Sequence, residues 1–239
     1  MNQPGFLELL GFGPNGWGPA MLAAAGMTIA VALTGFVVGA VIGGLGAWAK
    51  IAGGRVARGI ADAYTTVLRG IPDLLVIYLF YFGSSAVLTP LGRLFGATGF
   101  VSLPGFLAGA LAIGVVSGAY HTEVFRGAYR AVSRGEIEAA IASGMSPLLR
   151  LRRITGPLVL RYAMPGLGNV WQLVLKETAL ISVVGLVEIL RQAQIGAGST
   201  RQPFTFFIAA AILYLVISSV SGWGLRLAEL RLTRGLRRA

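Results

Sequence analysis

The chain has 239 residues, of which 55% are hydrophobic, only 12% are charged and none is cysteine, so disulfide bonds are excluded. A water-soluble domain carries about 25% charged residues, and this composition therefore favours a protein that crosses a membrane several times. The net charge of +11 is typical of nucleic-acid binding in soluble proteins, but here the basic residues flank apolar segments, which indicates orientation in an anionic bilayer and no nucleic-acid partner.

The first hydrophobic segment follows a short stretch rich in Gly and Pro. Residues 1–20 are expected to form an extracytoplasmic segment and not a cleavable signal peptide, because no Lys or Arg precedes the apolar run. A membrane-spanning helix is predicted at 21–49, which is uncharged. Within it Gly35, Gly39 and Gly43 recur every four residues, and small residues at this spacing let another helix approach closely.

Two further spans are predicted after a short basic loop at 50–58, and they cover about 71–89 and 104–122. Asp73 lies at the edge of the second span beside Pro72, which is expected to bend or begin the helix. An ionisable group at this position is costly unless it is paired or hydrated. Asp73 is therefore a candidate for the substrate pathway, with an interfacial ion pair as the alternative.

The fourth and fifth spans are predicted at about 166–190 and 203–225, with a polar, Gly-rich stretch between them. The fourth carries polar residues in its interior, among them Asn169, Gln172 and Glu177. Ionisable residues inside a membrane helix indicate function unless they balance charges on neighbouring helices or lie at a subunit interface. We therefore expect these three residues, with Asp73, to line the substrate pathway.

The basic residues fix the expected orientation. With five spans, fifteen Lys and Arg residues fall on one side of the membrane and three on the other. Because basic residues accumulate on the cytoplasmic side, the N-terminus is predicted outside. The loop at 133–165 and the basic tail at 226–239 are predicted in the cytoplasm.

The loop at 133–165 carries its own helix signals. Ser133 and Glu136 have the spacing of a capping box, which predicts a helix start. Gly144 suits the end of that helix. The Ser-Pro pair at 146–147 predicts the start of a second helix, since serine caps and proline fits the first turn. Two short amphipathic helices of this kind can insert into a partner's groove or lie on a membrane.

The same loop resembles the EAA signature of ABC importer permeases. The matching positions, at the family's spacing, are Glu138, Ala139, Ala140, Gly144, Ile154 and Pro157. Gly156 departs from the family pattern, which has leucine before the proline. YTTVLRGIPDLL at 64–75 and GAYHTEVFRGAY at 118–129 resemble the polar amino acid branch, particularly the permeases of histidine/lysine/arginine/ornithine and opine importers.

This resemblance implies an all-α, polytopic protein of the bacterial plasma (inner) membrane with five transmembrane helices and the type I ABC importer permease fold, its transmembrane domain at 21–225. It also implies a second permease subunit, homologous or identical, and two cytoplasmic ATPase subunits that grip the EAA residues. An extracytoplasmic binding protein would deliver a polar amino acid, either a basic one or an opine.

No catalytic residue, metal site or cofactor is expected in this chain. A phosphate-binding loop needs a glycine followed by lysine, and neither Lys50 nor Lys176 follows a glycine. ATP and Mg are therefore expected in the partner ATPase subunits.

Three alternatives stay open. The same machinery could import another polar amino acid, or the chain could be an ATP-independent channel or secondary transporter. A membrane enzyme that binds a phosphorylated head group would need acidic metal ligands, and no such cluster is evident.

Overall fold

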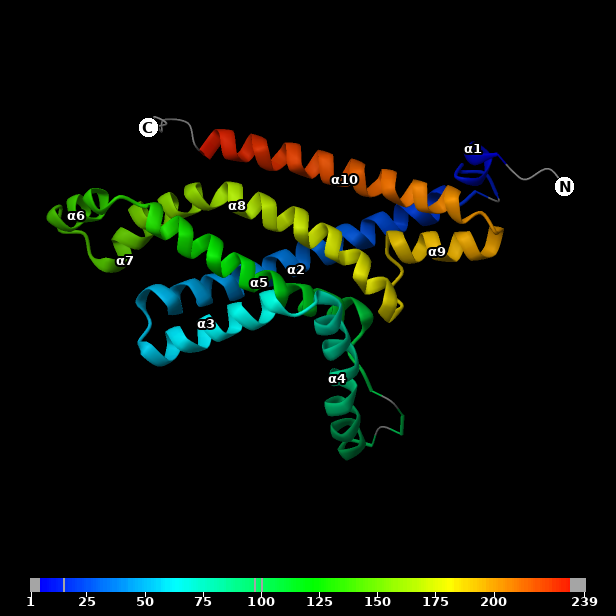
Figure 1. The fold of residues 1–239 in the computed structure, drawn as a ribbon, viewed down its shortest axis with the longest axis horizontal. Coiled ribbons are helices and arrows are strands. Elements are labelled where there is room, and N and C mark those ends of the chain that lie inside the picture. The colour runs from blue at the N-terminus through cyan, green and yellow to red at the C-terminus, as the bar shows by residue number, and fades with distance from the viewer. Residues whose placement is uncertain (1–4, 15, 97, 100, 233–239) are drawn as a thin grey trace. The chain divides into compact units, whose positions relative to one another are not determined.

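The computed structural model describes residues 5–14, 16–96, 98–99 and 101–232, and every regular element among them is helical (Figure 1). This confirms the predicted all-α class. Residues 1–4 and 233–239 of the two expected tails lie outside the described residues. The helices are α1 (Phe6–Leu9), α2 (Gly18–Ala52), α3 (Arg55–Gly70), α4 (Asp73–Leu94), α5 (Gly105–Ala131), α6 (Arg134–Ala142), α7 (Pro147–Arg150), the π-helix η1 (Leu151–Thr155), α8 (Gly156–Glu177), the 3-10 helix η2 (Thr178–Val184), α9 (Ile189–Thr200) and α10 (Pro203–Leu232).

Among the described residues, four helices are long and apolar enough to cross a membrane: α2, α4, α5 and α10. α2 and α10 contain the spans predicted at 21–49 and 203–225, and α4 and α5 overlap those predicted at 71–89 and 104–122, beginning at Asp73 and Gly105. The span predicted at about 166–190 is continuously helical only as far as Val184: α8 ends at Glu177 and continues as the 3-10 helix η2, which stops at Gly185, whose φ of 85° suits glycine. A membrane crossing by α8 remains a prediction.

The contacts divide the chain into two compact units. Unit 1 comprises residues 1–35, 72–113 and 173–220, and unit 2 comprises residues 36–71, 114–172 and 221–239.

In unit 2, glycines let α2 pack closely on α5, as their spacing predicts. A Cβ atom added at Gly39 would overlap Ser117, and one at Gly43 would overlap His121. In unit 1 the same holds at Gly35, where a Cβ atom would lie 2.9 Å from the side chain of Ile113. The close approach therefore requires the absence of side chains on this face of α2.

The basic loop expected at 50–58 is shorter than predicted. Only Gly53 and Gly54 separate α2 from α3, which runs back beside α2 (Figure 1). α3 is amphipathic and buries Ala61 and Thr65, and this helical period was obscured by its polar composition. The break at Pro72 before α4 matches the sequence prediction.

Unit 1 contains a further helix that the sequence did not reveal. The polar stretch after residue 188 forms α9, which buries Ile189, Ala193 and Ala197 against Phe206 of α10. Glu188 caps this helix, since its carboxylate accepts hydrogen bonds from the backbone N–H groups of the two residues after Ile189 at 2.9 and 2.7 Å. Small residues in a Gly-rich stretch thus form a helix because the cap and tertiary packing support it.

Candidate functional site

The loop at 133–165 has the two-helix form that the capping signals predict. Ser133 accepts a hydrogen bond from the backbone N–H of Glu136, and the Glu136 carboxylate accepts one from the backbone N–H of Ser133, which completes the capping box. α6 ends before Gly144, whose φ is 74°. Ser146 then caps α7 by accepting from the backbone N–H of Leu149 at 3.4 Å.

At the exit from this loop, α8 begins at Gly156 and runs through Pro157 and Pro165. Pro157 has no N–H to donate within the helix, and α8 follows directly after a π-helical segment. The wider π-helix η1 joins α7 to α8 without a loop, and π-helical turns occur often at functional sites.

The structure separates the predicted coupling residues by exposure. Glu138, Ala139, Gly144 and Pro157 are exposed, whereas Ala140 is buried. Ala139, Ala140, Ile154 and Pro157 line one hollow of about 470 Å³ between α6, η1 and the start of α8. The small side chain of Ala140 therefore lets α6 pack closely within the loop, whereas that of Ala139 leaves the exposed surface of α6 free of bulky groups.

Exposed apolar side chains surround these small residues. Ile141, Leu148 and Leu151 are 53%, 75% and 56% exposed. Apolar groups at the ends of two short helices are expected to be covered by a partner. The loop therefore has the chemistry of a docking surface.

In unit 1 the structure brings together two of the four predicted pathway residues. Asp73 begins α4 and Glu177 ends α8, and their carboxyl groups interact electrostatically. Glu177 is buried, at 6% exposure, and neither of its carboxylate oxygens makes a normal hydrogen bond with a described residue. A buried carboxylate next to a second carboxyl group is unfavourable unless a cation or a proton compensates it.

The other two predicted pathway residues lie in unit 2. Asn169 is exposed, and Gln172 lies against Gly222 of α10. Their place in the pathway remains a prediction.

An ionic cluster in unit 2 was missed by the sequence reasoning. Lys50 of α2 donates to Thr65 of α3 at 2.6 Å and to Glu123 of α5 at 2.7 Å, and it pairs with Asp62 of α3 at 2.8 Å. Arg126 also pairs with Glu123. The hydrogen bond from Lys50 lowers the pKa of Asp62 below its usual value. The sequence signal for this cluster was Lys50, at the end of an uncharged apolar run, followed by Asp62 on the amphipathic helix α3.

Comparison with known proteins identifies the family. The chain matches the family described as "Binding-protein-dependent transport system inner membrane component" over residues 40–234. The chain belongs to this family. The match includes the loop and both carboxyl residues.

Individual relatives extend the match to nearly the whole chain. It is 61% identical over 234 residues to the octopine transport system permease protein OccQ of Rhizobium meliloti, covering 98% of this chain and 99% of that protein. It is 38% identical to the histidine/lysine/arginine/ornithine transport system permease protein HisQ of Escherichia coli, covering 94% and 98%. A solved amino acid ABC transporter with histidines matches with a TM-score of 0.76 and 30% identity, over 90% of this chain and 95% of that one. The resemblance to ABC importer permeases is thereby confirmed.

Proposed function

We propose that this permease forms part of the pathway of an ATP-driven importer for basic amino acids or opines. The names of OccQ and HisQ refer to octopine and to basic amino acids. One structural observation carries the choice of a cationic substrate, namely that the buried carboxyl group of Glu177 lies beside a second carboxyl group, that of Asp73. A guanidinium group offers five N–H donors in a planar arrangement that matches carboxylates.

The proposed assembly follows from the family and from the loop. A second permease subunit, homologous or identical, completes the pathway, and an extracytoplasmic binding protein delivers the substrate. Two ATPase subunits, which hold ATP and Mg, bind the loop through Glu138, Ala139 and Gly144. Closure of the ATPases shifts the loop as a short rigid body and biases the pathway between outward-open and inward-open states.

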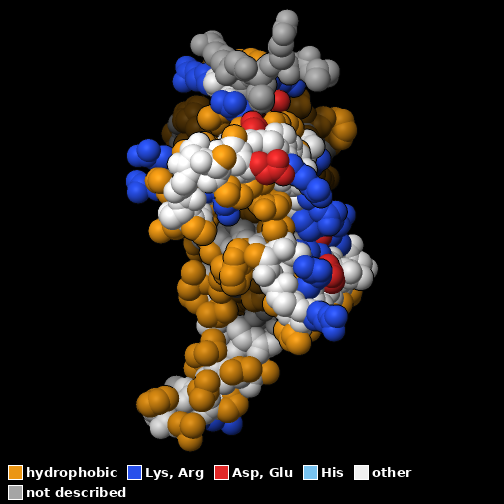
Figure 2. Space-filling model, turned by 90° about the vertical axis from the view of Figure 1, so that its left-hand side faces the viewer, with side chains coloured by type: hydrophobic (Ala, Val, Ile, Leu, Met, Phe, Trp, Pro, Cys, Tyr) orange, Lys and Arg blue, Asp and Glu red, His pale blue; other side chains and the backbone are white. Residues whose placement is uncertain are grey.

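The orientation belongs to this proposal. Basic side chains mark the cytoplasmic side, and Figure 2 shows a face on which Lys and Arg outnumber Asp and Glu. The loop and the basic end of α10 would lie in the cytoplasm, and the N-terminus outside.

The test is uptake by the purified chain, reconstituted into vesicles with the subunits that co-purify with it and its binding protein. Labelled arginine, histidine, octopine and glutamine serve as substrates. We expect uptake of the cationic or opine substrates that depends on ATP. Glu177→Gln should lower it by at least tenfold, because the cation loses its buried countercharge. Glu229→Gln makes the same chemical change on α10 in unit 2 and should leave uptake unchanged.

Three results would contradict the proposal. Uptake of glutamine alone would favour the same machinery with another polar substrate. Uptake without ATP, or the absence of any co-purifying ATPase, would favour a channel or secondary transporter.

A further inference from the structure

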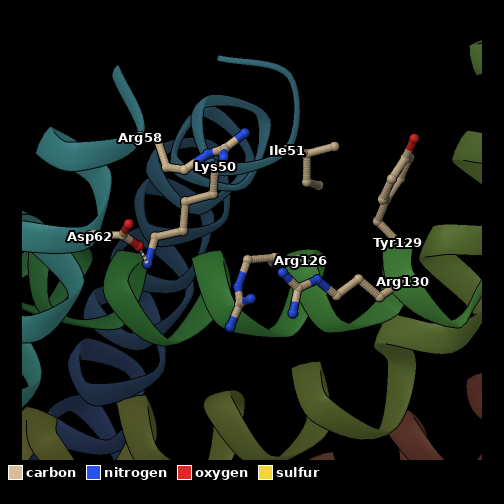
Figure 3. Close-up of a pocket in the computed structure, with 7 residues that line it drawn as sticks. All are labelled: Lys50, Ile51, Arg58, Asp62, Arg126, Tyr129 and Arg130. Atoms are coloured by element: carbon tan, nitrogen blue, oxygen red, sulfur yellow. Dashed lines mark ion pairs between the residues drawn. The ribbon is translucent and has the colours of Figure 1, made fainter. Parts of the chain in front are cut away.

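A basic pocket in unit 2 has no role in the proposed transport mechanism. It encloses about 320 Å³ and is lined by Lys50, Ile51, Arg58, Asp62, Arg126, Tyr129 and Arg130 (Figure 3). Its cationic groups come from three helices, since Lys50 belongs to α2, Arg58 to α3 and the other two arginines to successive turns of α5. Convergence of four cations on one hollow favours an anionic ligand.

The charges inside this pocket are not balanced. Lys50 and Arg126 pair with Glu123, and Lys50 also pairs with Asp62. Arg58 and Arg130 make no ion pair within 4 Å with any residue that the structure describes. Arg58 acts on Asp62 only as a longer-range charge. Four cationic groups therefore face the two carboxylates of Asp62 and Glu123, and two positive charges remain for a ligand. Guanidinium binds phosphate oxygens in a bidentate manner.

An apolar groove continues from the basic pocket. It encloses about 510 Å³ and shares Ile51 and Tyr129 with that pocket. Its remaining lining is mainly apolar: Ala40, Gly44, Ala47, Trp48, Ala52, Phe125, Ile137, Pro147, Arg150, Leu151, Thr155, Gly156 and Val159. Trp48 is 66% exposed at the end of α2, and tryptophan is enriched where membrane helices meet the headgroups.

We infer that the basic pocket and the apolar groove together bind one anionic phospholipid of the cytoplasmic leaflet, with its phosphate on Arg58 and Arg130 and an acyl chain in the groove. A molecule with a phosphate at one end and a hydrocarbon chain at the other matches the order of polar and apolar lining. Basic pockets between membrane helices on the cytoplasmic side suit such headgroups. The assignment to the cytoplasmic leaflet depends on the orientation given under the proposed function.

The position of the groove gives the lipid a place to act. Ile137 of α6, Pro147 of α7 and Thr155 of η1 form part of its wall, and these elements make up the proposed ATPase-binding loop. A lipid in the groove would contact the loop through these residues, whereas Ala139 lines a separate hollow. A bound anionic lipid would thus stabilise the position of α6, α7 and η1.

The experiment compares lipid retention in the full chain, purified with its associated subunits from vesicles of phosphatidylglycerol and phosphatidylcholine with the same acyl chains. Native mass spectrometry counts the retained lipids. The double variant Arg58→Gln/Arg130→Gln removes the two available guanidinium groups. Arg226→Gln/Arg231→Gln removes the same charge from α10, outside the pocket. We expect wild type and the α10 variant to retain phosphatidylglycerol preferentially. In the pocket variant the ratio of retained phosphatidylglycerol to phosphatidylcholine should fall about tenfold.

A second pair of variants tests the acyl chain. Gly44 lines the groove, and a Cβ atom added there would meet no other atom within 4 Å, so Gly44→Leu can place a side chain in the space of the groove. Gly26 of the same helix also has open space and lies outside the groove, which makes Gly26→Leu the control. We expect only Gly44→Leu to lower phosphatidylglycerol retention, and inorganic phosphate not to displace the lipid.

Three results would overturn the lipid site. These are equal retention in wild type and the Arg58→Gln/Arg130→Gln variant, displacement by inorganic phosphate with no effect of Gly44→Leu, or cross-linking of Arg58→Cys to a co-purifying protein subunit. Equal retention would show that the two arginines bind no lipid. Displacement by phosphate would indicate a site for free anions, and the cross-link would indicate a contact with another protein subunit. Lipid retention is measured without transport, so loss of uptake alone would contradict only the proposed function.

Discussion

The ammonium group of Lys50 lies 2.7 Å from the carboxylate of Glu123 and ties the end of α2 to α5. The Lys50 side chain is only 6% exposed. Removing Lys50 takes away the ammonium group that Glu123 and Asp62 share, and leaves Glu123 with Arg126 as its one ion-pair partner among the described residues. Lys50→Met should therefore destabilise the protein by about 2 kcal/mol, measured as a lower thermal unfolding midpoint in detergent.

A double-mutant cycle gives the control for this prediction. Adding Glu123→Gln to Lys50→Met removes the carboxylate that lost the ammonium group, so the double variant should be more stable than the sum of the two single effects implies. Simple additivity would show that the two groups do not stabilise one another.

The pairing of Lys50 with Asp62 predicts a pH dependence. The pKa of Asp62 is lowered in the folded protein, so its contribution to stability is present above the pKa of an unfolded aspartate, about 4, and is lost as the pH falls through the folded value. The difference in unfolding midpoint between wild type and Asp62→Asn should shrink as the pH is lowered from about 5 to about 3. The effect should be small, because Asp62 is largely exposed. A difference that grows in acid would contradict the ion pair.

The glycines of α2 give a prediction with a control on the same helix. A Cβ atom at Gly43 meets the side chain and backbone of His121, so Gly43→Ala should force α2 away from α5 and cost about 1–3 kcal/mol. Gly26 has open space, and Gly26→Ala should be neutral or stabilising by up to about 1 kcal/mol. Thermal unfolding of both variants in detergent decides the matter. Equal midpoints would mean that the two helices can separate without cost.

The features that the sequence predicted correctly depend on neighbouring residues. The capping box at Ser133 and the helix stop at Gly144 each need only a few adjacent positions, and both are present. The spacing of Gly35, Gly39 and Gly43 identified a packing face, although it did not identify α5 as the partner. Long apolar runs likewise identified four of the spans.

The features that were missed depend on contacts between distant parts of the chain. α9 is stabilised by burial against Phe206 and by the buried Glu188 cap, neither of which is visible in a Gly-rich local pattern. Asp73 and Glu177 were each singled out as ionisable residues near a span, but their proximity arises from the meeting of α4 with the end of α8. A sequence pattern indicates which residue types are unusual, whereas the fold decides which of them meet.

The left-handed conformation of Gly144 leads to the last prediction, on the loop proposed to bind the ATPases. Its φ of 74° costs a residue with a side chain about 1–2 kcal/mol, and asparagine tolerates this conformation better than a β-branched residue. Gly144→Val should therefore distort the turn between α6 and α7 and lower substrate-stimulated ATP hydrolysis by the purified complex, whereas Gly144→Asn should largely retain it. Both variants should still insert into the membrane, since the loop lies outside the apolar helices. Full hydrolysis by the valine variant would show that the turn geometry is not needed for coupling, and equal loss in both would indicate that any side chain at this exposed position blocks the ATPase.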